Sequence, residues 1–299
     1  MTMIYIRNDK TDPFYNQAFE EYVFEHSSLE EDLLLLWINE PSLVCGRCQN
    51  VFQEMNMPLA GKMNIPVIRR TTGGGTVYHD RGNLNYTMIR KRREGCGLDY
   101  DSFLAPVIKA LASMGVPAHK RNTCDIAIGD MKISGSAQAV KRDRVLHHGT
   151  LLFDADLNCL GKLLTPPAGK MICKAVASVP SPVTNIKQHL QGAAYSSIAE
   201  FAESLKGALL GEKGCETAVS AEEERQILML KKEKYDTWQW NIGKGPKFEF
   251  YPEKKGIWLC VEAGVVADSS VRSYIGRPAE EVFREVYSEE NDYDAKTEQ

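Results

Sequence analysis

A run of glycines behind two arginines is the first segment of the sequence whose residue types could do chemistry. Residues 69–79 are Arg-Arg-Thr-Thr-Gly-Gly-Gly-Thr-Val-Tyr-His. Three adjacent glycines let the backbone approach a ligand closely, and their N–H groups can cradle an anion. Alternation along a strand puts Arg69 and Arg70 on opposite faces, so one of them can reach a phosphate or carboxylate. The spacing is neither a P-loop nor a dinucleotide fingerprint, and a flexible turn between surface arginines is the alternative.

A lysine on a short hairpin is the second candidate. Gly129-Asp130 is a plausible two-residue turn between residues 125–128 and 131–134. Regular pairing across it puts Asp125, Ala127, Lys132 and Ser134 on one face, and Ile126, Ile128, Met131 and Ile133 on an apolar face. The first face would hold a cation over phosphate oxygens beside a carboxylate that can reach a metal ion. The alternative is a solvated hairpin face with a weak surface ion pair.

The residues around this hairpin refine the expectation. Gly135-Ser136-Ala137 leaves room for a ligand beside Lys132. His147 and His148 are adjacent in a strand, so they point to opposite faces and at most one is expected to reach the site. If the hairpin strand extends to Cys124, that side chain shares the apolar face with Ile126, away from Lys132, as a small buried hydrophobe.

Several elements must position these residues. Asp12 can cap a helix that begins at Pro13. Apolar runs and helical spacing predict strands at 33–38, 65–70, 84–89 and 145–153, helices around 104–111 and at 198–210, and a Glu- and Lys-rich helix within 211–234. The polar end, 288–299, is expected to be frayed.

The composition bounds the class of protein. The chain has 299 residues, 43% hydrophobic and 25% charged, which suits a globular protein with one large and one small domain or two similar ones. A net charge of -4 argues against a general nucleic-acid binder. The N-terminal residues resemble no signal or transit peptide, and no apolar run is long enough to span a membrane. The eight cysteines are expected to be reduced, and the Cys45–Cys48 pair is weak evidence for zinc.

Four ordered motifs together resemble the lipoate–protein ligase A family. They are RRTTGGGTVYHDRGNLNY at 69–86, KISGSAQ at 132–138, HHGTLLFDADL at 147–157 and GRCQN at 46–50. SVPSPVTNI at 178–186 and WQWNIGKGP at 238–246 also match, so the resemblance covers roughly residues 1 to 250. The GRCQN match explains Cys48 more simply than a metal does, as a variable position.

The resemblance implies an α+β fold like that of biotin protein ligases and class II aminoacyl-tRNA synthetases. A mixed, largely antiparallel sheet flanked by helices would form a catalytic domain at 1–240. A short α+β accessory domain would occupy 246–299.

The resemblance also implies a cytoplasmic ligase of cofactor salvage. With ATP and Mg²⁺ it would convert lipoate to lipoyl-adenylate and pyrophosphate. It would then transfer the lipoyl group to a lysine of a carrier. The implied carriers are the lipoyl domains of 2-oxoacid dehydrogenase E2 subunits and the glycine cleavage H protein, with no nucleic-acid or membrane partner.

The implied site residues carry over onto matching positions. Lys132 is the catalytic residue, which contacts the acyl carbonyl and the α-phosphate. The implied ATP-binding residues are Arg70, Gly75, Thr76, Val77, Tyr78, Asp125 and Lys132. The implied lipoate-binding residues are Arg70, Gly74, Gly75, His79, Lys132, His148 and Gly149. Asp125 is the implied magnesium ligand.

Two departures from the family pattern leave more than one activity open. Cys124 stands where the family usually has asparagine, and the segment after Pro246 is short. An ATP-independent lipoyl or octanoyl transferase of the same fold would use a cysteine nucleophile, and Cys124 is the cysteine nearest the expected site. The remaining candidates are a non-catalytic acyl- or carrier-binding protein and a biotin ligase. Lipoate and octanoate both stay open as the substrate. The oligomeric state stays open as well.

Overall fold

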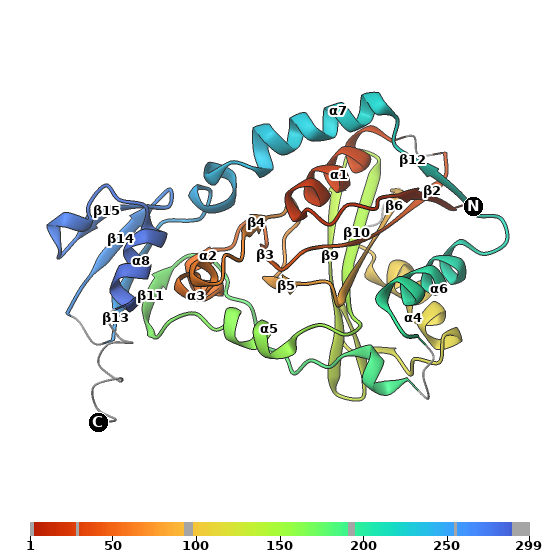
Figure 1. Cartoon of the computed structure of the whole chain (residues 1–299), viewed down its shortest axis with the longest axis horizontal. Coiled ribbons are helices and arrows are strands. Elements are labelled where there is room, and N and C mark those ends of the chain that lie inside the picture. The colour runs from red at the N-terminus through yellow and green to blue at the C-terminus, as the bar shows by residue number, and fades with distance from the viewer. Residues whose placement is uncertain (1–2, 28–29, 93–97, 191–194, 254–255, 289–299) are drawn as a thin grey trace.

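The computed structural model of the chain describes residues 3–27, 30–92, 98–190, 195–253 and 256–288. Figure 1 shows a broad sheet on one side of the molecule and a smaller sheet, built mainly from C-terminal strands, on the other. A third sheet of short strands lies between them.

The large sheet has the strand order β12-β1-β2-β6-β10-β9-β8-β7 within the described residues. Its strands are β1 (Met3–Arg7), β2 (Asp32–Ile38), β6 (Asn83–Lys91), β7 (His119–Lys120), β8 (Asp125–Ile128), β9 (Met131–Lys141), β10 (Arg144–Leu152) and β12 (Cys215–Ala218). β1 is parallel to β12 and β2, and every other neighbouring pair is antiparallel. The prediction of a mixed, largely antiparallel sheet is confirmed.

Helices cover both faces of this sheet. α4 (Tyr100–Ser113) and α6 (Ile198–Leu210) bury Phe103 and Phe201 against one face. α1 (Pro13–His26) and α7 (Ala221–Leu230) cover the other face, where Phe19 is 1% exposed. α1 begins as expected, because the Asp12 carboxylate accepts the N–H of Phe14 at 2.9 Å. Full burial of one such phenylalanine stabilises the fold by about 2–3 kcal/mol.

The two smaller sheets complete the architecture. β3 (Ser42–Cys45) lies between β4 (Val67–Arg69) and β5 (Val77–His79). The short helices between β3 and β4 are α2 (Val51–Glu54) and α3 (Met57–Lys62). The other sheet has the order β11-β13-β14-β15, with β11 (Gly169–Cys173), β13 (Phe248–Pro252), β14 (Leu259–Glu262) and β15 (Val265–Ser269). It packs with α5 (Leu157–Leu163) and α8 (Ala279–Ser288).

The C-terminal sheet takes one strand from the middle of the chain. Residues of β11 pair antiparallel with β13, from Gly169 with Pro252 to Cys173 with Phe248. Phe52 and Leu163 share one apolar core with Phe248 and Phe283. The division into domains at 1–240 and 246–299 therefore stays a prediction, and the two predicted domains share a sheet and a core.

One expected helix is different in the structure. Residues 211–234 do not form a continuous helix, because 215–218 form β12, which extends the sheet edge at β1. Ser220 and Glu223 form a reciprocal capping box that begins α7 at Ala221. A π-helical turn, Lys231–Tyr235, follows, and a second one is Gln239–Gly243. The short 3-10 turns are Ile186–His189 and Arg272–Tyr274.

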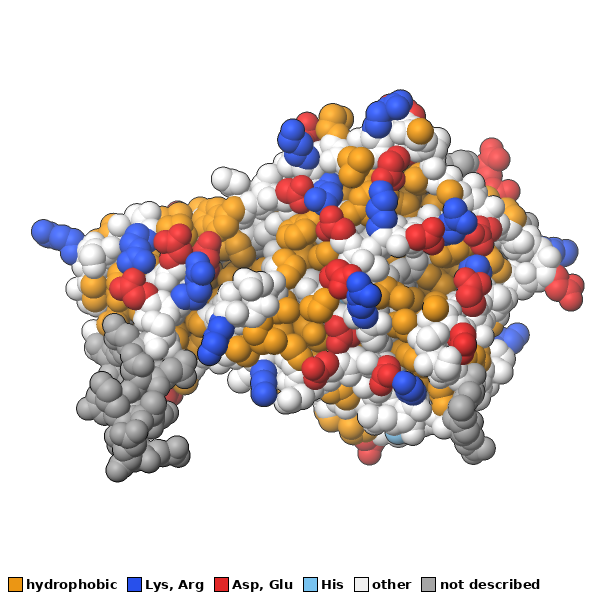
Figure 2. Space-filling view, viewed as in Figure 1, with side chains coloured by type: hydrophobic (Ala, Val, Ile, Leu, Met, Phe, Trp, Pro, Cys, Tyr) orange, Lys and Arg blue, Asp and Glu red, His pale blue; other side chains and the backbone are white. Residues whose placement is uncertain are grey.

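Further expectations concern the chain's ends and surface. Of the predicted frayed end at 288–299, Ser288 is the last residue of α8, and 289–299 lie outside the described residues. In the described ranges, no helix combines the length and the hydropathy that crossing a membrane requires. On the face drawn in Figure 2, lysine and arginine side chains alternate with acidic ones instead of gathering in a basic patch.

Candidate active site

A cavity of about 870 Å³ lies between the large sheet and the β3–β5 sheet. One transverse row of the large sheet faces it, with Trp37 on β2, Asn85 on β6, Thr150 on β10, Gly135 on β9 and Asp125 on β8. A second cavity, of about 580 Å³ and with a leucine-rich wall, shares Lys132 and Gly135 with the first. Lys132 therefore stands where the two cavities meet.

The charged pair at this junction is Lys132 and Asp125. The Lys132 Nζ lies 2.8 Å from the Asp125 Oδ1, and their side chains are 28% and 6% exposed. The Asn122 amide donates to the Asp125 Oδ2 at 2.8 Å. Asn122 Oδ1 also accepts the N–H groups of Cys124 and Asp125, which fixes the turn before β8. Both carboxylate oxygens are thus engaged by groups of the chain.

A β-bulge corrects the predicted register of the hairpin. Ala127 faces Lys132 as expected, but Ile126 faces Ser134 and Asp125 faces Gly135. The extra residue lets Ile133 and Ser134 both lie buried, and Ser134 leaves the face of Lys132. Gly135 takes its place, and a side chain there would meet the Lys132 Nζ at 2.8 Å. The bulge therefore gives the lysine room to cross to Asp125.

The predicted position of Cys124 is wrong. β8 begins one residue later, so strand alternation does not govern Cys124, and its side chain lines the large cavity with Asp125 and Lys132. Its Sγ lies 3.7 Å from the Asp125 Oδ1. Burial first, and then the neighbouring Asp125 charge, raise the pKa of this thiol above its usual value. A raised pKa disfavours the thiolate that a cysteine nucleophile requires.

Arg70 shapes the glycine loop from within. Its guanidinium donates to the carbonyls of Val44, Gly73 and Gly75 and to the Thr72 hydroxyl, at 2.6–3.1 Å. Burial lowers the pKa of Arg70 to about 10. The N–H groups of Gly73, Gly74 and Gly75 make no hydrogen bond within the described part of the chain. Arg70 thus holds the loop carbonyls and leaves its N–H groups for an anion.

Arg69 points the other way, as alternation predicts. It is fully buried and donates to backbone carbonyls of Gly46, Arg47 and Gln49, and to those of Trp240 and Asn241. The glycine loop also needs a glycine at position 46, because a side chain there would meet the Gly74 oxygen at 2.1 Å.

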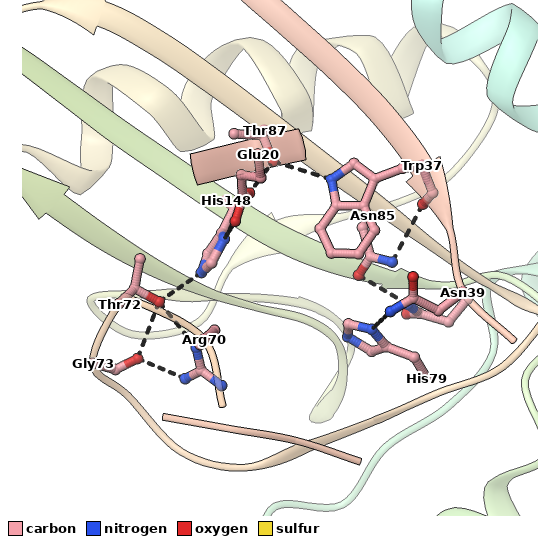
Figure 3. Close-up of polar contacts among 11 residues, drawn as sticks. Glu20, Trp37, Asn39, Arg70, Thr72, Gly73, His79, Asn85, Thr87 and His148 are labelled. Carbon is pink, nitrogen blue, oxygen red and sulfur yellow. Dashed lines mark hydrogen bonds and ion pairs between the residues drawn. The ribbon is translucent and has the colours of Figure 1, made fainter. Parts of the chain in front are cut away.

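A buried polar chain supports the cavity from α1, as Figure 3 shows. The Glu20 carboxylate, 2% exposed as a residue, lies 2.9 Å from the His148 Nδ1 and accepts the Thr87 hydroxyl. The His148 Nε2 lies 2.8 Å from the Thr72 hydroxyl, which in turn accepts from Arg70. His148 is thereby linked to the glycine loop on one side and to α1 on the other.

The three histidines of this region differ in environment. His148 and His79 line the cavity, whereas His147 packs on the opposite face against Phe103, with ring centroids 5.0 Å apart. The prediction that at most one of His147 and His148 reaches the site is confirmed. Burial lowers the pKa of His79 to about 3 and that of His147 to about 3, so both rings are neutral near pH 7.

The segment 174–183, here called the strap, closes one side of both cavities. Ser178 is its anchor, since its hydroxyl donates to Glu54 and accepts from Gln49 at 3.0 Å and from the Thr76 N–H at 3.2 Å. At the far end of the strap, the Pro182 carbonyl accepts the backbone N–H of Lys132 at 2.9 Å. The strap therefore ties the glycine loop to the strand that carries Lys132.

Most of the predicted residues come together. Those lining the large cavity are Arg70, Gly74, Gly75, Thr76, Val77, His79, Asp125, Lys132, His148 and Gly149. Tyr78 does not join them, because strand alternation turns it into the second cavity and the C-terminal core. Among the described residues no cluster of three or more His, Cys, Asp or Glu could hold a metal ion.

Sequence reasoning missed several residues of the site. The cavity or its supports also include Gln17, Glu20, Trp37, Gln49, Glu54 and Thr72, and the anchoring role of Ser178 was not foreseen. A signal for the first two exists in the sequence. Gln17 and Glu20, like Asn16, stand among the aromatic and apolar residues of α1 that are buried, and buried polar side chains in such a place require partners.

Comparison with known proteins gives a consistent result. The family model described as lipoyl protein ligase A/B catalytic domain matches residues 12–210. Lipoate–protein ligase 1 of Staphylococcus aureus is 37% identical over 249 residues, which cover 83% of this chain and 75% of that protein. A lipoate–protein ligase of Bacillus subtilis is 34% identical over 280 residues, covering 90% of this chain and 84% of that protein.

Solved structures agree with the fold. A lipoate–protein ligase A bound with ATP has a TM-score of 0.69 at 24% identity, over 82% of this chain and 100% of that one. A bi-partite lipoate protein ligase of Thermoplasma acidophilum, studied with its E2 lipoyl domain, has a TM-score of 0.68 at 23% identity. It covers 81% of this chain and 96% of that one.

Proposed function

This chain belongs to the lipoyl protein ligase A/B catalytic domain family, and from that premise we propose that it activates lipoate with ATP and attaches it to a carrier lysine. The observation that carries the proposal is the place of Lys132, at the junction of two cavities and next to the glycine loop. A compact cation beside free N–H groups suits a reaction that gathers negative charge on phosphate.

The first half-reaction joins lipoate to the α-phosphate of ATP. A lipoate carboxylate oxygen forms a bond to that phosphorus, and the bond to the β-phosphate oxygen breaks, releasing pyrophosphate. Lys132 stabilises the crowded oxygens of the transition state, and the N–H groups of Gly73–Gly75 hold phosphate. Arg70 contributes by keeping the loop carbonyls away from the anion.

The second half-reaction transfers the acyl group. The carrier lysine amine attacks the acyl carbonyl of the adenylate, the bond to the AMP oxygen breaks, and the amine proton is released. Lys132 reaches that carbonyl from the junction, so one ammonium serves both steps. The acyl chain occupies the large cavity, bordered by Gly74, His79, His148 and Gly149.

Magnesium enters this proposal with ATP, where it would neutralise phosphate charge. Asp125 is the acidic residue beside Lys132, but Lys132 and Asn122 already engage its two oxygens. The described residues thus fit an orienting role for Asp125 better than a metal ligand. We propose that Asp125 holds the Lys132 ammonium in place.

The proposed carriers are lipoyl domains of 2-oxoacid dehydrogenase E2 subunits, and the glycine cleavage H protein. The Thermoplasma ligase studied with its E2 lipoyl domain supports the first class. The ATP-independent transferase is disfavoured by the raised pKa of Cys124.

The test uses the whole chain and a purified lipoyl domain. With lipoate and Mg-ATP, the enzyme should release pyrophosphate before any carrier is added. Adding the carrier should give the mass shift of one lipoyl amide. Carrier acylation from an acyl-carrier thioester without nucleotide, together with no pyrophosphate from ATP, would establish the transferase instead.

A further inference from the structure

The far end of the large cavity lies across the sheet from Lys132. From β9 to β10, β6 and β2 the neighbouring strands are about 4.8 Å apart, so Trp37 lies roughly 14 Å from the strand of Lys132. That reach is comparable to an extended octanoyl-length chain. A carboxylate at Lys132 therefore places the distal end of its acyl chain near Asn85 and Trp37.

The far end is not a plain hydrocarbon pocket, because Gln17 of α1 lines it. Gln17 is 2% exposed and its amide has no hydrogen-bond partner among the described residues. The preceding Asn16 donates to the Ile38 carbonyl and to the Asn39 oxygen, so this turn of α1 is fixed beside the end of β2. An amide that lines a cavity and receives no hydrogen bond from the described chain is available to bond a ligand atom.

His79 adds a second polar atom to the same end. Its ring lies 5.9 Å from the Trp37 ring. Because Asn16 donates to Asn39 Oδ1, the Asn39 Nδ2 must be the donor to the His79 Nδ1 at 3.0 Å (Figure 3). The neutral ring then carries its proton on Nε2, and this buried N–H has no partner in the described structure. Gln17 and His79 thus both bring unpaired polar atoms to this region.

We infer that Gln17 is a specificity-determining residue whose amide recognises sulfur at the distal end of the acyl chain. This inference rests on the proposed function. A dithiolane ring offers weak acceptor lone pairs to the Gln17 amide N–H, and polarisable sulfur also suits the Trp37 ring. A hydrocarbon end of the same shape would leave the amide desolvated and unpaired.

The test compares two acids of matched shape. Lipoate carries a dithiolane, and 5-cyclopentylpentanoate carries a cyclopentane ring on the same chain. The wild-type enzyme should adenylate lipoate with a kcat/KM about tenfold higher, the ratio that the net free energy of one ordinary hydrogen bond sets. In Gln17→Leu the ratio should fall to about one, because the carbocyclic acid gains and lipoate loses.

Gln226→Leu is the matched control, since Gln226 lies on α7 and bonds Tyr22 and Glu222, outside the cavity. Its ratio should equal that of wild type. Gln17→Met, which keeps the length of the side chain without an amide, provides a second variant and should also lower the ratio. An unchanged ratio in folded Gln17→Leu and Gln17→Met would overturn the inference. If the wild-type enzyme released no pyrophosphate with either acid, the proposed function itself would be refuted.

Discussion

The two ends of the large cavity are held together by different means. At the reactive end, the Lys132 ammonium meets one carboxylate, and the lysine side chain is 28% exposed. At the far end, His148 and Glu20 have side chains 11% and 3% exposed and belong to a continuous hydrogen-bonded chain that reaches Trp37 and Arg70. Both ring nitrogens of His148 are engaged there, whereas the ammonium of Lys132 keeps donors for a ligand.

The difference indicates a catalytic role for the reactive end and a structural role for the hydrogen-bonded chain around the far end. The Lys132 ammonium is partly exposed and can turn a donor to a phosphate, while Asn122 keeps its hydrogen bond to the Asp125 carboxylate. A buried, saturated network loses much when one member is removed, since its partners are then left unpaired. Substitutions at the reactive end should therefore change turnover, and those around the far end should change stability and selectivity.

Lys132→Ala should produce the largest effect. Adenylation should fall by roughly 100-fold or more, the scale for losing one preorganised transition-state donor. Lys132→Arg should not restore it, because a planar fork cannot replace a compact ammonium beside Gly135. Pyrophosphate release measures the rate. Both variants should be compared with wild type at equal folded fraction, measured by urea unfolding, because Lys132→Ala leaves the buried Asp125 carboxylate without its cation. Near-normal turnover in either variant would refute the assignment.

Lowering the pH should reduce the free energy of unfolding, because two histidines are buried in their neutral form. His79 and His147 have pKa values of about 3 when folded and roughly 6.5 when unfolded. Below about pH 6.5 the unfolded chain binds protons that the folded chain does not. Stability is therefore full above that pH and lost as the pH falls towards 3, by about 2 kcal/mol per histidine between pH 7 and 5.

Urea unfolding at pH 7 and pH 5 measures this loss. His147→Gln is the informative variant, since His147 lies on the sheet face opposite the cavity. It should remove about 2 kcal/mol of the pH-dependent loss, whatever its stability at pH 7. An equal pH dependence in the variant and the wild type would show that the ring is not buried in its neutral form.

Cys124→Ser should have the smallest effect. The thiol lines the reactive end, but burial and the Asp125 charge raise its pKa, which lowers the share of nucleophilic thiolate. Carrier acylation should stay within several-fold of wild type, and mass spectrometry should find no acyl thioester on Cys124 after exposure to an activated acyl donor. A folded variant with no transfer at all, or a trapped thioester, would instead give this cysteine a covalent role.

The sequence predicted what depends on local pattern. The helix cap at Asp12, the central strands β2, β6 and β10 and the opposite directions of Arg69 and Arg70 follow from rules that act over a few residues. The glycine loop and Lys132 were found because their motifs are contiguous. Their meeting in one cavity rested on the family resemblance, since no local rule brings residues 70 and 132 together.

The missed features depend on distant contacts or on one-residue irregularities. Glu20 meets His148 across the sheet, and Ser178 meets Glu54 and Gln49 through the strap. No local pattern shows such pairs. Cys124 was misplaced because alternation was extended past the true start of β8.

The bulge in β9 decides where this hairpin can change its length. Two consecutive residues, Ile133 and Ser134, stand there against one residue of β8, Ile126. Deleting either of the two would remove one buried side chain. Lys132 would still face Ala127, and Gly135 would still face Asp125. A deletion at any other paired position of β9 would turn the residues beyond it to the opposite face of the sheet. Over evolution, one-residue length changes in this hairpin should therefore gather at 133–134.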